Sequence, residues 1–248
     1  MPVQSIDIQT ADGTMDAKLF SPEGQGPWPG VVMISDAGGT RPAFEAMAQR
    51  LASEGYVVLL PHVYYREGRA PLLGQGSMAD ESFRKRVFAL LATLTPERIL
   101  TDAAAEVGFL TSRPEVKKGG IGVVGYCMGG AVAMRMMAGF PEQVAAAASY
   151  HGGHLATDDP RSPHLLADKL RGELYFGHAD KDVFMDAASI ARLEEALKRA
   201  GVTFQSELYE GSGHGFAVNG SPTFTPQASE RHWKTMLALF GRLRAASI

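Results

Sequence analysis

The chain of 248 residues has a single cysteine, Cys127, and this scarcity excludes two kinds of site. One cysteine cannot form an intramolecular disulfide, and the sequence has no Cys-x-x-Cys pair or cysteine–histidine cluster that would supply a tetrahedral zinc site. A chain without disulfides is typical of a reducing compartment. We therefore expect a protein without a disulfide framework or a structural zinc ion.

Long apolar runs and an excess of positive charge are also missing. No run approaches the ~20 apolar residues of a membrane span, and the N-terminal MPVQSIDIQTADG lacks the charged start and apolar core of a signal peptide. The formal net charge of -3 gives no basic surplus to attract nucleic acid or anionic lipid. The sequence predicts a cytoplasmic protein with neither a nucleic-acid nor a membrane partner.

What the chain does have is enough apolar material for a large core. Hydrophobic residues make up 45% and charged residues 21% of the sequence, as in soluble globular proteins. Single α/β domains reach this length, and no internal repeat, low-complexity tract or interdomain linker divides the chain. We expect one domain over residues 1–248.

Apolar runs and amphipathic segments alternate along most of the sequence. A hairpin is predicted for residues 3–10 and 14–20, and later strands are predicted at 31–35, 56–61, 120–126, 145–150, 173–178 and 204–210. Helices are predicted at 42–54, 82–94, 97–110, 131–139, 189–201 and 230–243, and a loop at 65–75. This order is typical of an α/β fold with a mainly parallel central sheet and helices on both faces. Ligands bind at the carboxyl ends of such strands.

The segment GVVGYCMGGAVA contains the most informative strand end. Gly125, Cys127 and Gly129 form a Gly-x-nucleophile-x-Gly turn between a strand and a helix, the nucleophile elbow. Such a turn strains the nucleophile and leaves room only for glycine at the flanking positions. It exposes the sulfur at a helix N-terminus, which favours thiolate. The alternative is an inert cysteine packed as a small apolar residue.

A thiol that attacks a carbonyl needs a base, and the base needs an orienting partner. Asp180 follows one predicted strand and His214 follows the next, so both would emerge at the same sheet edge as Cys127. Asp180 could instead cap a helix, with Asp182 as the functional carboxylate. The order nucleophile, acid, histidine is that of α/β-hydrolases, and the sequence holds no Gly-x-Ser-x-Gly elbow.

Three segments together resemble the dienelactone hydrolase family, the cysteine-nucleophile branch of the α/β-hydrolases. GYCMGG resembles the family's elbow, GHADKDV its Gly-x-x-Asp segment, and YEGSGHGF its Tyr-x-x-x-x-His-x-Phe segment. The likeness runs from the N-terminal hairpin to the last helix. It implies an α/β-hydrolase fold, no cofactor, and a triad of Cys127, Asp180 and His214.

The resemblance also implies several supporting residues. Asp36 stands where the family has a glutamate that contacts the cysteine, and a carboxylate there would disfavour thiolate. Aspartate is shorter, which leaves its reach to the sulfur open. The amides of Ala37 and Met128 would form the oxyanion hole. Tyr126, beside the nucleophile, would bind or modulate the substrate.

Other positions depart from the family pattern and bear on the substrate. Family members hold a substrate carboxylate with an arginine and a tyrosine on the helix after the loop and with a second arginine beyond the histidine. Arg84 is expected to supply the first arginine, but Phe88 replaces the tyrosine and Val218 the second arginine. The usual Pro-Asp-x-Tyr reads PHVY here, which brings His62 near the site, most simply as a loop residue.

The segment YHGGHLATDDPRSPH raises a metal hypothesis through His151, His154 and His164. Loop histidines without regular ligand spacing are more often hydrogen-bonded or solvated, so we expect no metal.

The sequence therefore predicts a hydrolase, monomeric or weakly dimeric, that cleaves a small ester or lactone through Cys127, His214 and Asp180 and an acyl-enzyme intermediate. One alternative is a carboxylesterase or thioesterase for neutral substrates on the same fold. The other is a non-catalytic ligand binder whose Cys127 is redox-sensitive.

Overall fold

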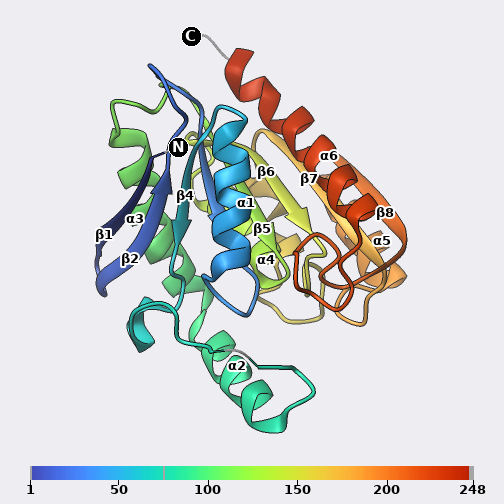
Figure 1. Cartoon of the computed structure of the whole chain (residues 1–248). Helices are drawn as coiled ribbons and strands as arrows, with labels where there is room; N and C mark the ends of the chain where they lie inside the picture. The colour runs from blue at the N-terminus through green and yellow to red at the C-terminus, as the bar shows by residue number, and fades with distance from the viewer. Residues whose placement is uncertain (1, 75, 246–248) are drawn as a thin grey trace.

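A central eight-stranded sheet organises the chain (Figure 1). The structure, a computed structural model, describes residues 2–74 and 76–245. The strands lie in the order β1-β2-β4-β3-β5-β6-β7-β8. Their bounds are β1 Val3–Thr10, β2 Gly13–Phe20, β3 Gly30–Ile34, β4 Val57–Pro61, β5 Ile121–Tyr126, β6 Val144–Tyr150, β7 Glu173–Lys181 and β8 Thr203–Gly213.

The directions of the strands depend on whether a hairpin or a crossover connects them. The hairpin β1–β2 is antiparallel and joins β4 antiparallel, whereas the pairs from β4 through β8 are parallel. The short strands β3, β4 and β5 are buried along their whole length, as expected where helices cover both faces. All parallel strands therefore end at one edge of the sheet, where their following loops gather.

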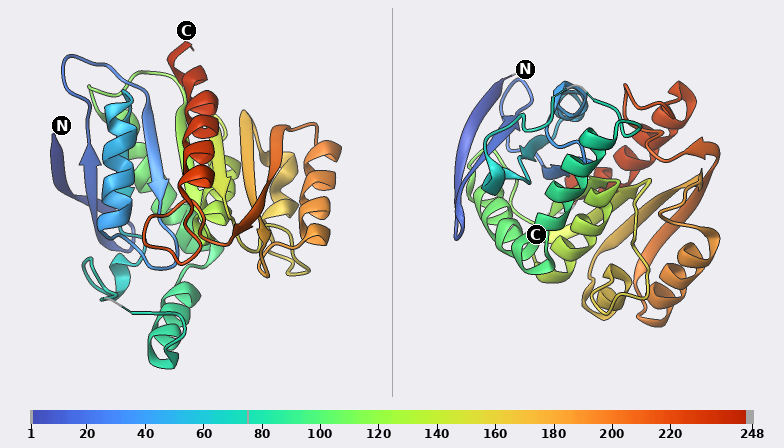
Figure 2. Two further views of the ribbon diagram at one scale, coloured as in Figure 1. Left: turned by 45° about the vertical axis from the view of Figure 1, so that its right-hand side comes forward. Right: turned by 90° about the horizontal axis from the view of Figure 1, so that it is seen from below.

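Helices cover the sheet on both faces (Figures 1 and 2). One core contains residues of α1 and α6, and the other contains residues of α3, α4 and α5. The helix bounds are α1 Pro42–Ser53, α2 Glu81–Thr93, α3 Pro96–Ser112, α4 Met128–Gly139, α5 Ala187–Arg199 and α6 Pro226–Ala245, with short 3₁₀ helices η1 Tyr65–Glu67 and η2 Pro163–Lys169.

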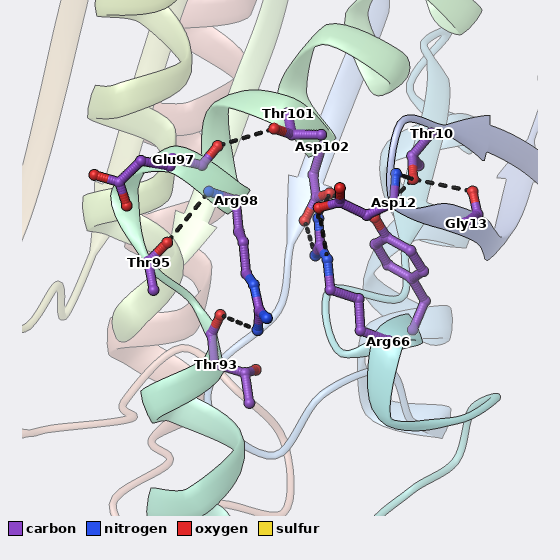
Figure 3. A network of polar contacts seen from close by, with 11 residues as sticks. Thr10, Asp12, Gly13, Arg66, Thr93, Thr95, Glu97, Arg98, Thr101 and Asp102 are labelled. Carbon is purple, nitrogen blue, oxygen red and sulfur yellow. Dashed lines mark hydrogen bonds and ion pairs between the residues drawn. The ribbon is translucent and has the colours of Figure 1, made fainter.

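Helix α2 stands apart from these layers. It lies beyond the edge at which the parallel strands end (Figures 1 and 2), and among its described residues only Val87 is buried. A polar network fixes the chain on both sides of it (Figure 3). Before α2, Arg66 donates to Asp102 of α3 at 2.6 Å and to Asp12 of the hairpin at 2.7 Å. After it, Arg98 donates to the carbonyl of Thr93.

The fold predicted from the sequence, a mainly parallel sheet between two helical layers, is confirmed. Most predicted elements differ from the observed ones by one to three residues at an end, and β7 continues to Lys181 instead of ending at 178. The last residue of the predicted 65–75 loop, Gln75, lies outside the described residues. Within the described residues, no helix is both long enough and apolar enough to cross a bilayer.

Candidate active site

The turn between β5 and α4 has the geometry of a nucleophile elbow. Cys127 has φ 54° and ψ -117°, a conformation that costs free energy for a residue with a side chain. A Cβ at Gly125 would lie 1.8 Å from the carbonyl oxygen of Gly129, and a Cβ at Gly129 would lie 2.7 Å from that of Ser35. Both positions therefore require glycine, as the sequence predicted.

The loop after β6 fixes the elbow from the other side. The amide of Cys127 donates to the carbonyl of Tyr150 at 3.2 Å, and the amide of Gly153 donates to the carbonyl of Cys127 at 3.2 Å. The cysteine is partly exposed. The alternative of a thiol sealed in the interior does not fit this placement.

His214 follows β8 and pairs with a buried carboxylate. Its Nδ1 donates to Oδ2 of Asp182 at 2.7 Å, and the Asp182 side chain is only 1% exposed. Burial lowers the pKa of His214, but the hydrogen bond to Asp182 and the proximity of Cys127 outweigh burial and raise the pKa to about 10. The other ring nitrogen, Nε2, is buried and has no hydrogen-bond partner in the described chain. Asp182 thus orients the imidazole and leaves Nε2 for chemistry.

The prediction that Asp180 orients His214 is wrong in this structure. Asp180 lies within β7, at a register shift between Ala179 and Lys181, and is exposed. Its Oδ2 accepts the amide of Gly211 at 2.9 Å. Because β7 is longer than predicted, the carboxylate that follows the strand is Asp182.

Two rings enclose His214. Phe184 lies with its centroid 5.0 Å away and His151 at 5.3 Å, both edge-to-face. His151 is buried with φ 39°, and burial, followed by the nearby His214, lowers its pKa well below the usual value. His151 therefore packs beside His214 as a neutral ring.

The two residues whose amides are expected to bind an oxyanion lie at the start of α4 and in the loop after β3. Met128 is the first residue of α4, where amides have no intrahelical acceptor. Ala37 follows β3, and its carbonyl accepts the hydroxyl of Tyr64 at 3.1 Å. Among the described hydrogen bonds outside the helix and sheet ladders, neither amide is a donor. Their role stays a prediction.

Comparison with known proteins shows the family. The sequence profile of the dienelactone hydrolase family matches residues 15–244. The chain belongs to the dienelactone hydrolase family. A Synechocystis protein named "Putative carboxymethylenebutenolidase" is 28% identical over 247 residues, covering 95% of this chain and 98% of that protein. A Bradyrhizobium protein named "Probable 2-oxo-3-(5-oxofuran-2-ylidene)propanoate lactonase" is 24% identical, covering 94% and 91%.

Solved structures of dienelactone hydrolases share the fold. The crystal structure of a "Putative Dienelactone Hydrolase" from Klebsiella pneumoniae superposes with a TM-score of 0.86 at 21% identity, covering 97% of this chain and 98% of that one. A dienelactone hydrolase from Anabaena variabilis gives a TM-score of 0.69 at 17% identity, covering 97% of each chain. The predicted α/β-hydrolase fold is confirmed, and the family match with the named relatives confirms the prediction of an ester or lactone hydrolase.

Asp36, at the position of the family's glutamate, has different partners from those that the resemblance implied. Both oxygens of Asp36 are bound by Arg41, at 2.5 and 2.7 Å, and Oδ1 also accepts the amide of Gly38 at 2.8 Å. No hydrogen bond joins Asp36 to Cys127 in the described residues. The question left open by the sequence, whether Asp36 reaches the sulfur, is answered here by an ion pair with Arg41 instead.

The predicted substrate-binding residues lie in two different environments, the core and helix α2. Tyr126 is fully buried, and its hydroxyl donates to His232 of α6 at 2.8 Å, so the expectation that it meets substrate is wrong. Its side chain points into the core, on the α6 side of the sheet. Arg84 donates to the carbonyl of Met78, and Phe88 is 51% exposed, both on the projecting α2. Their contact with substrate stays a prediction.

The remaining histidines do not gather at one point. His62 donates from Nε2 to the carbonyl of Gly68 at 3.0 Å and so braces its loop. His154 packs against Phe184, and His164 shares a hydrogen bond with Ser162. No metal-binding group of three or more His, Cys, Asp or Glu side chains occurs among the described residues.

Sequence reasoning missed two residues of this candidate site. Tyr64 is buried, and burial, Asp36 and Cys127 together raise its pKa. It is the last residue of the PHVY segment, in which the sequence had drawn attention to His62 alone. Arg41, five residues after Asp36, had no signal because its pairing depends on the loop's shape.

Proposed function

We propose that this protein hydrolyses a small ester or lactone, without a cofactor, with Cys127 as nucleophile, His214 as base and Asp182 as the orienting acid. One observation carries the proposal: a partly exposed, strained cysteine at a helix N-terminus adjoins an imidazole whose far nitrogen is hydrogen-bonded to a buried carboxylate. A base and an acid in this relation serve nucleophilic catalysis.

Acylation begins with attack of the Cys127 sulfur on the acyl carbon. The thiol proton resides on His214, where Asp182 stabilises the imidazolium. The amides of Ala37 and Met128 bind the developing oxyanion; one such donor typically contributes about 3 kcal/mol to transition-state stabilisation. As the intermediate collapses, the bond to the leaving oxygen breaks and His214 gives that oxygen its proton. The product is a thioester-linked acyl-enzyme.

In deacylation, His214 acts as a base towards water, and the Cys127 sulfur becomes the leaving group. His214 takes a proton from water, and the resulting hydroxide attacks the thioester carbon. The carbon–sulfur bond breaks, the acid is released, and the sulfur returns to its starting state. Phe184 and His151, packed edge-to-face on His214, keep the imidazole in place through both half-reactions.

Several observations favour an uncharged substrate over a carboxylated lactone. Val218, at the place of the family's second arginine, is buried in the core. Arg41 is occupied by Asp36. Phe184, which packs on His214, also borders a mainly polar hollow of about 310 Å³ that includes Arg192, and Arg192 is paired with Asp158 at 2.8 Å. Because Arg41 and Arg192 are already paired and Val218 is apolar, none of these three side chains would hold a substrate carboxylate.

A hydrolysis screen with paired substrates tests the proposal. We expect turnover of neutral esters such as 4-nitrophenyl acetate, slower turnover of lactones that carry a carboxylate, and loss of activity in Cys127→Ala. The alanine variant should keep the wild-type circular dichroism spectrum. Equal rates for Cys127→Ala and wild type would remove the mechanism, whereas a preference for the carboxylated lactone would overturn only the substrate assignment. Labelling of Cys127 without any turnover would favour the ligand binder.

A further inference from the structure

The loop after β3 holds a carboxylate and a guanidinium in a closed pair. Arg41 binds both oxygens of Asp36, and the same turn brings the Gly38 amide to Oδ1. The two side chains are 33% and 20% exposed. Bidentate pairs of this kind are directional and strong for their size, so the negative charge of Asp36 is matched within its own loop.

The loop is shaped to keep Arg41 in this position. A Cβ at Gly38 would lie 2.8 Å from Nη1 of Arg41, so the glycine leaves space for the guanidinium. Nη1 also donates to the carbonyl of Gly39, and the guanidinium lies 4.8 Å from the centroid of the Phe44 ring. Arg41 is therefore fixed from several directions at once.

Asp36 and Cys127 share an electrostatic environment. Tyr64 donates to Ala37, the residue after Asp36, and both Asp36 and Cys127 act on its pKa. The elbow also abuts the start of this loop, because Gly129 has room for no more than a hydrogen beside the carbonyl of Ser35. An unpaired carboxylate here would oppose a negative charge on the sulfur.

The other charged groups around Cys127 favour a thiolate. His214, backed by Asp182, supplies a positive partner, and the sulfur stands at the N-terminus of α4. His151 is neutral and Tyr64 remains protonated, because burial shifts the pKa of each towards its uncharged form. The carboxylate of Asp36, if it were unpaired, would act in the opposite sense.

We propose that Arg41 is a positioning residue that holds the Asp36 carboxylate within its own loop and neutralises its charge, so that this charge does not oppose attack by the Cys127 sulfur. The proposal rests on the assigned role of Cys127 and deepens it. Arg41 need not touch substrate.

Alkylation of Cys127, the only cysteine of the chain, measures this property without turnover. Iodoacetamide is uncharged, and the thiolate displaces its iodide to form a carbon–sulfur bond. At pH 7, Arg41→Met should slow alkylation by up to about tenfold, since a freed carboxylate nearby opposes negative charge on the sulfur. Asp36→Asn should react at the wild-type rate or faster. The double variant Arg41→Met/Asp36→Asn should recover the wild-type rate.

The double variant separates charge from structure. A merely structural role for Arg41 would leave the double variant as slow as Arg41→Met. Arg50→Met is the matched control, because it removes another bidentate pair of α1, with Glu230, and should not change the rate. An unchanged rate in Arg41→Met, or no recovery in the double variant, would overturn the proposal.

A second variant, Arg41→Lys, keeps the test valid if Arg41→Met does not fold. The side chain introduced by Arg41→Lys carries one ammonium group and cannot bind both carboxylate oxygens in the same fork. Its alkylation rate should therefore lie between that of wild type and one tenth of it, and a wild-type rate would contradict the proposal. Absence of ester hydrolysis with this alkylation pattern intact would count against the proposed function alone.

Discussion

At the scale of single residues, His214 governs the site because its two ring nitrogens face opposite environments. Nδ1 binds the buried Asp182 at 2.7 Å, and Nε2 is unpartnered within the described chain. Burial opposes protonation, yet Asp182 and Cys127 raise the pKa of His214 to about 10. The imidazolium is therefore stable at neutral pH, which is the state needed to stabilise a thiolate and then protonate a leaving group.

Two neighbouring aspartates provide a matched test of this arrangement. Asp182→Asn should lower kcat by about a thousandfold or more, because the amide no longer stabilises the imidazolium or fixes the ring. Asp180→Asn should change kcat by less than about threefold, since the Asp180 carboxylate is exposed and accepts the amide of Gly211 rather than a proton of His214. Steady-state kinetics on one neutral ester measures both. A larger loss in Asp180→Asn than in Asp182→Asn would reverse the assignment.

The sequence showed which residue types would meet, but not which aspartate. Cys127 and His214 could be predicted because each follows a strand end, and all parallel strands end at the same edge. Asp180 and Asp182 are two residues apart, and the choice depends on how far β7 continues and on its register shift. The pairing of Arg41 with Asp36 depends on a turn whose shape no periodicity encodes.

At the scale of elements, the elbow is possible because β5, β3 and α4 approach one another more closely than side chains allow. Gly125 faces the backbone of Gly129, and Gly129 faces that of Ser35. The strain of Cys127 at φ 54° is sustained by hydrogen bonds to the end of β6 and to the loop that follows it. The motif could be predicted from the sequence because this steric demand selects glycine.

Alanine at these glycines tests the close approach. Gly125→Ala should destabilise the protein by about 3 kcal/mol or more, because its Cβ would overlap backbone that cannot move without breaking the turn. Gly108→Ala is the control, since, apart from its chain neighbours and the adjacent backbone of α3, no described atom lies within 4 Å of its Cβ position. That variant should stabilise the protein by about 0.5–1 kcal/mol. Urea unfolding measures both, and equal free energies of unfolding would contradict the crowding.

At the scale of the whole molecule, the core contains histidines that fold in their neutral form. His178 in β7 is 2% exposed, and burial lowers its pKa to about 4. His232 is fully buried behind Tyr126, and burial lowers its pKa to about 3. Below about pH 6.5 the unfolded chain takes up protons that these groups cannot accept when folded. Each therefore makes the folded state less stable as the pH falls from there towards its folded pKa.

Removing one of these histidines should make the free energy of unfolding depend less on pH in the acid range. Between about pH 6 and pH 4.5, the free energy of unfolding of His178→Phe should fall less steeply than that of wild type, by up to about 1.4 kcal/mol per pH unit. Burial raises the pKa of Glu106 to about 8, which acts in the opposite direction, so the variant is compared with wild type at each pH. Parallel curves from urea titrations would refute the buried-histidine account.

The account as a whole requires a covalent acyl group on Cys127 during turnover. The most direct measurement is mass spectrometry of the intact protein, quenched with acid within the first turnovers of 4-nitrophenyl acetate. We expect a mass increase of one acetyl group, located by peptide mapping at Cys127 and absent from Cys127→Ala. Hydrolysis by wild type with no acyl adduct at any time, or with the adduct on a residue other than Cys127, would contradict the central claim.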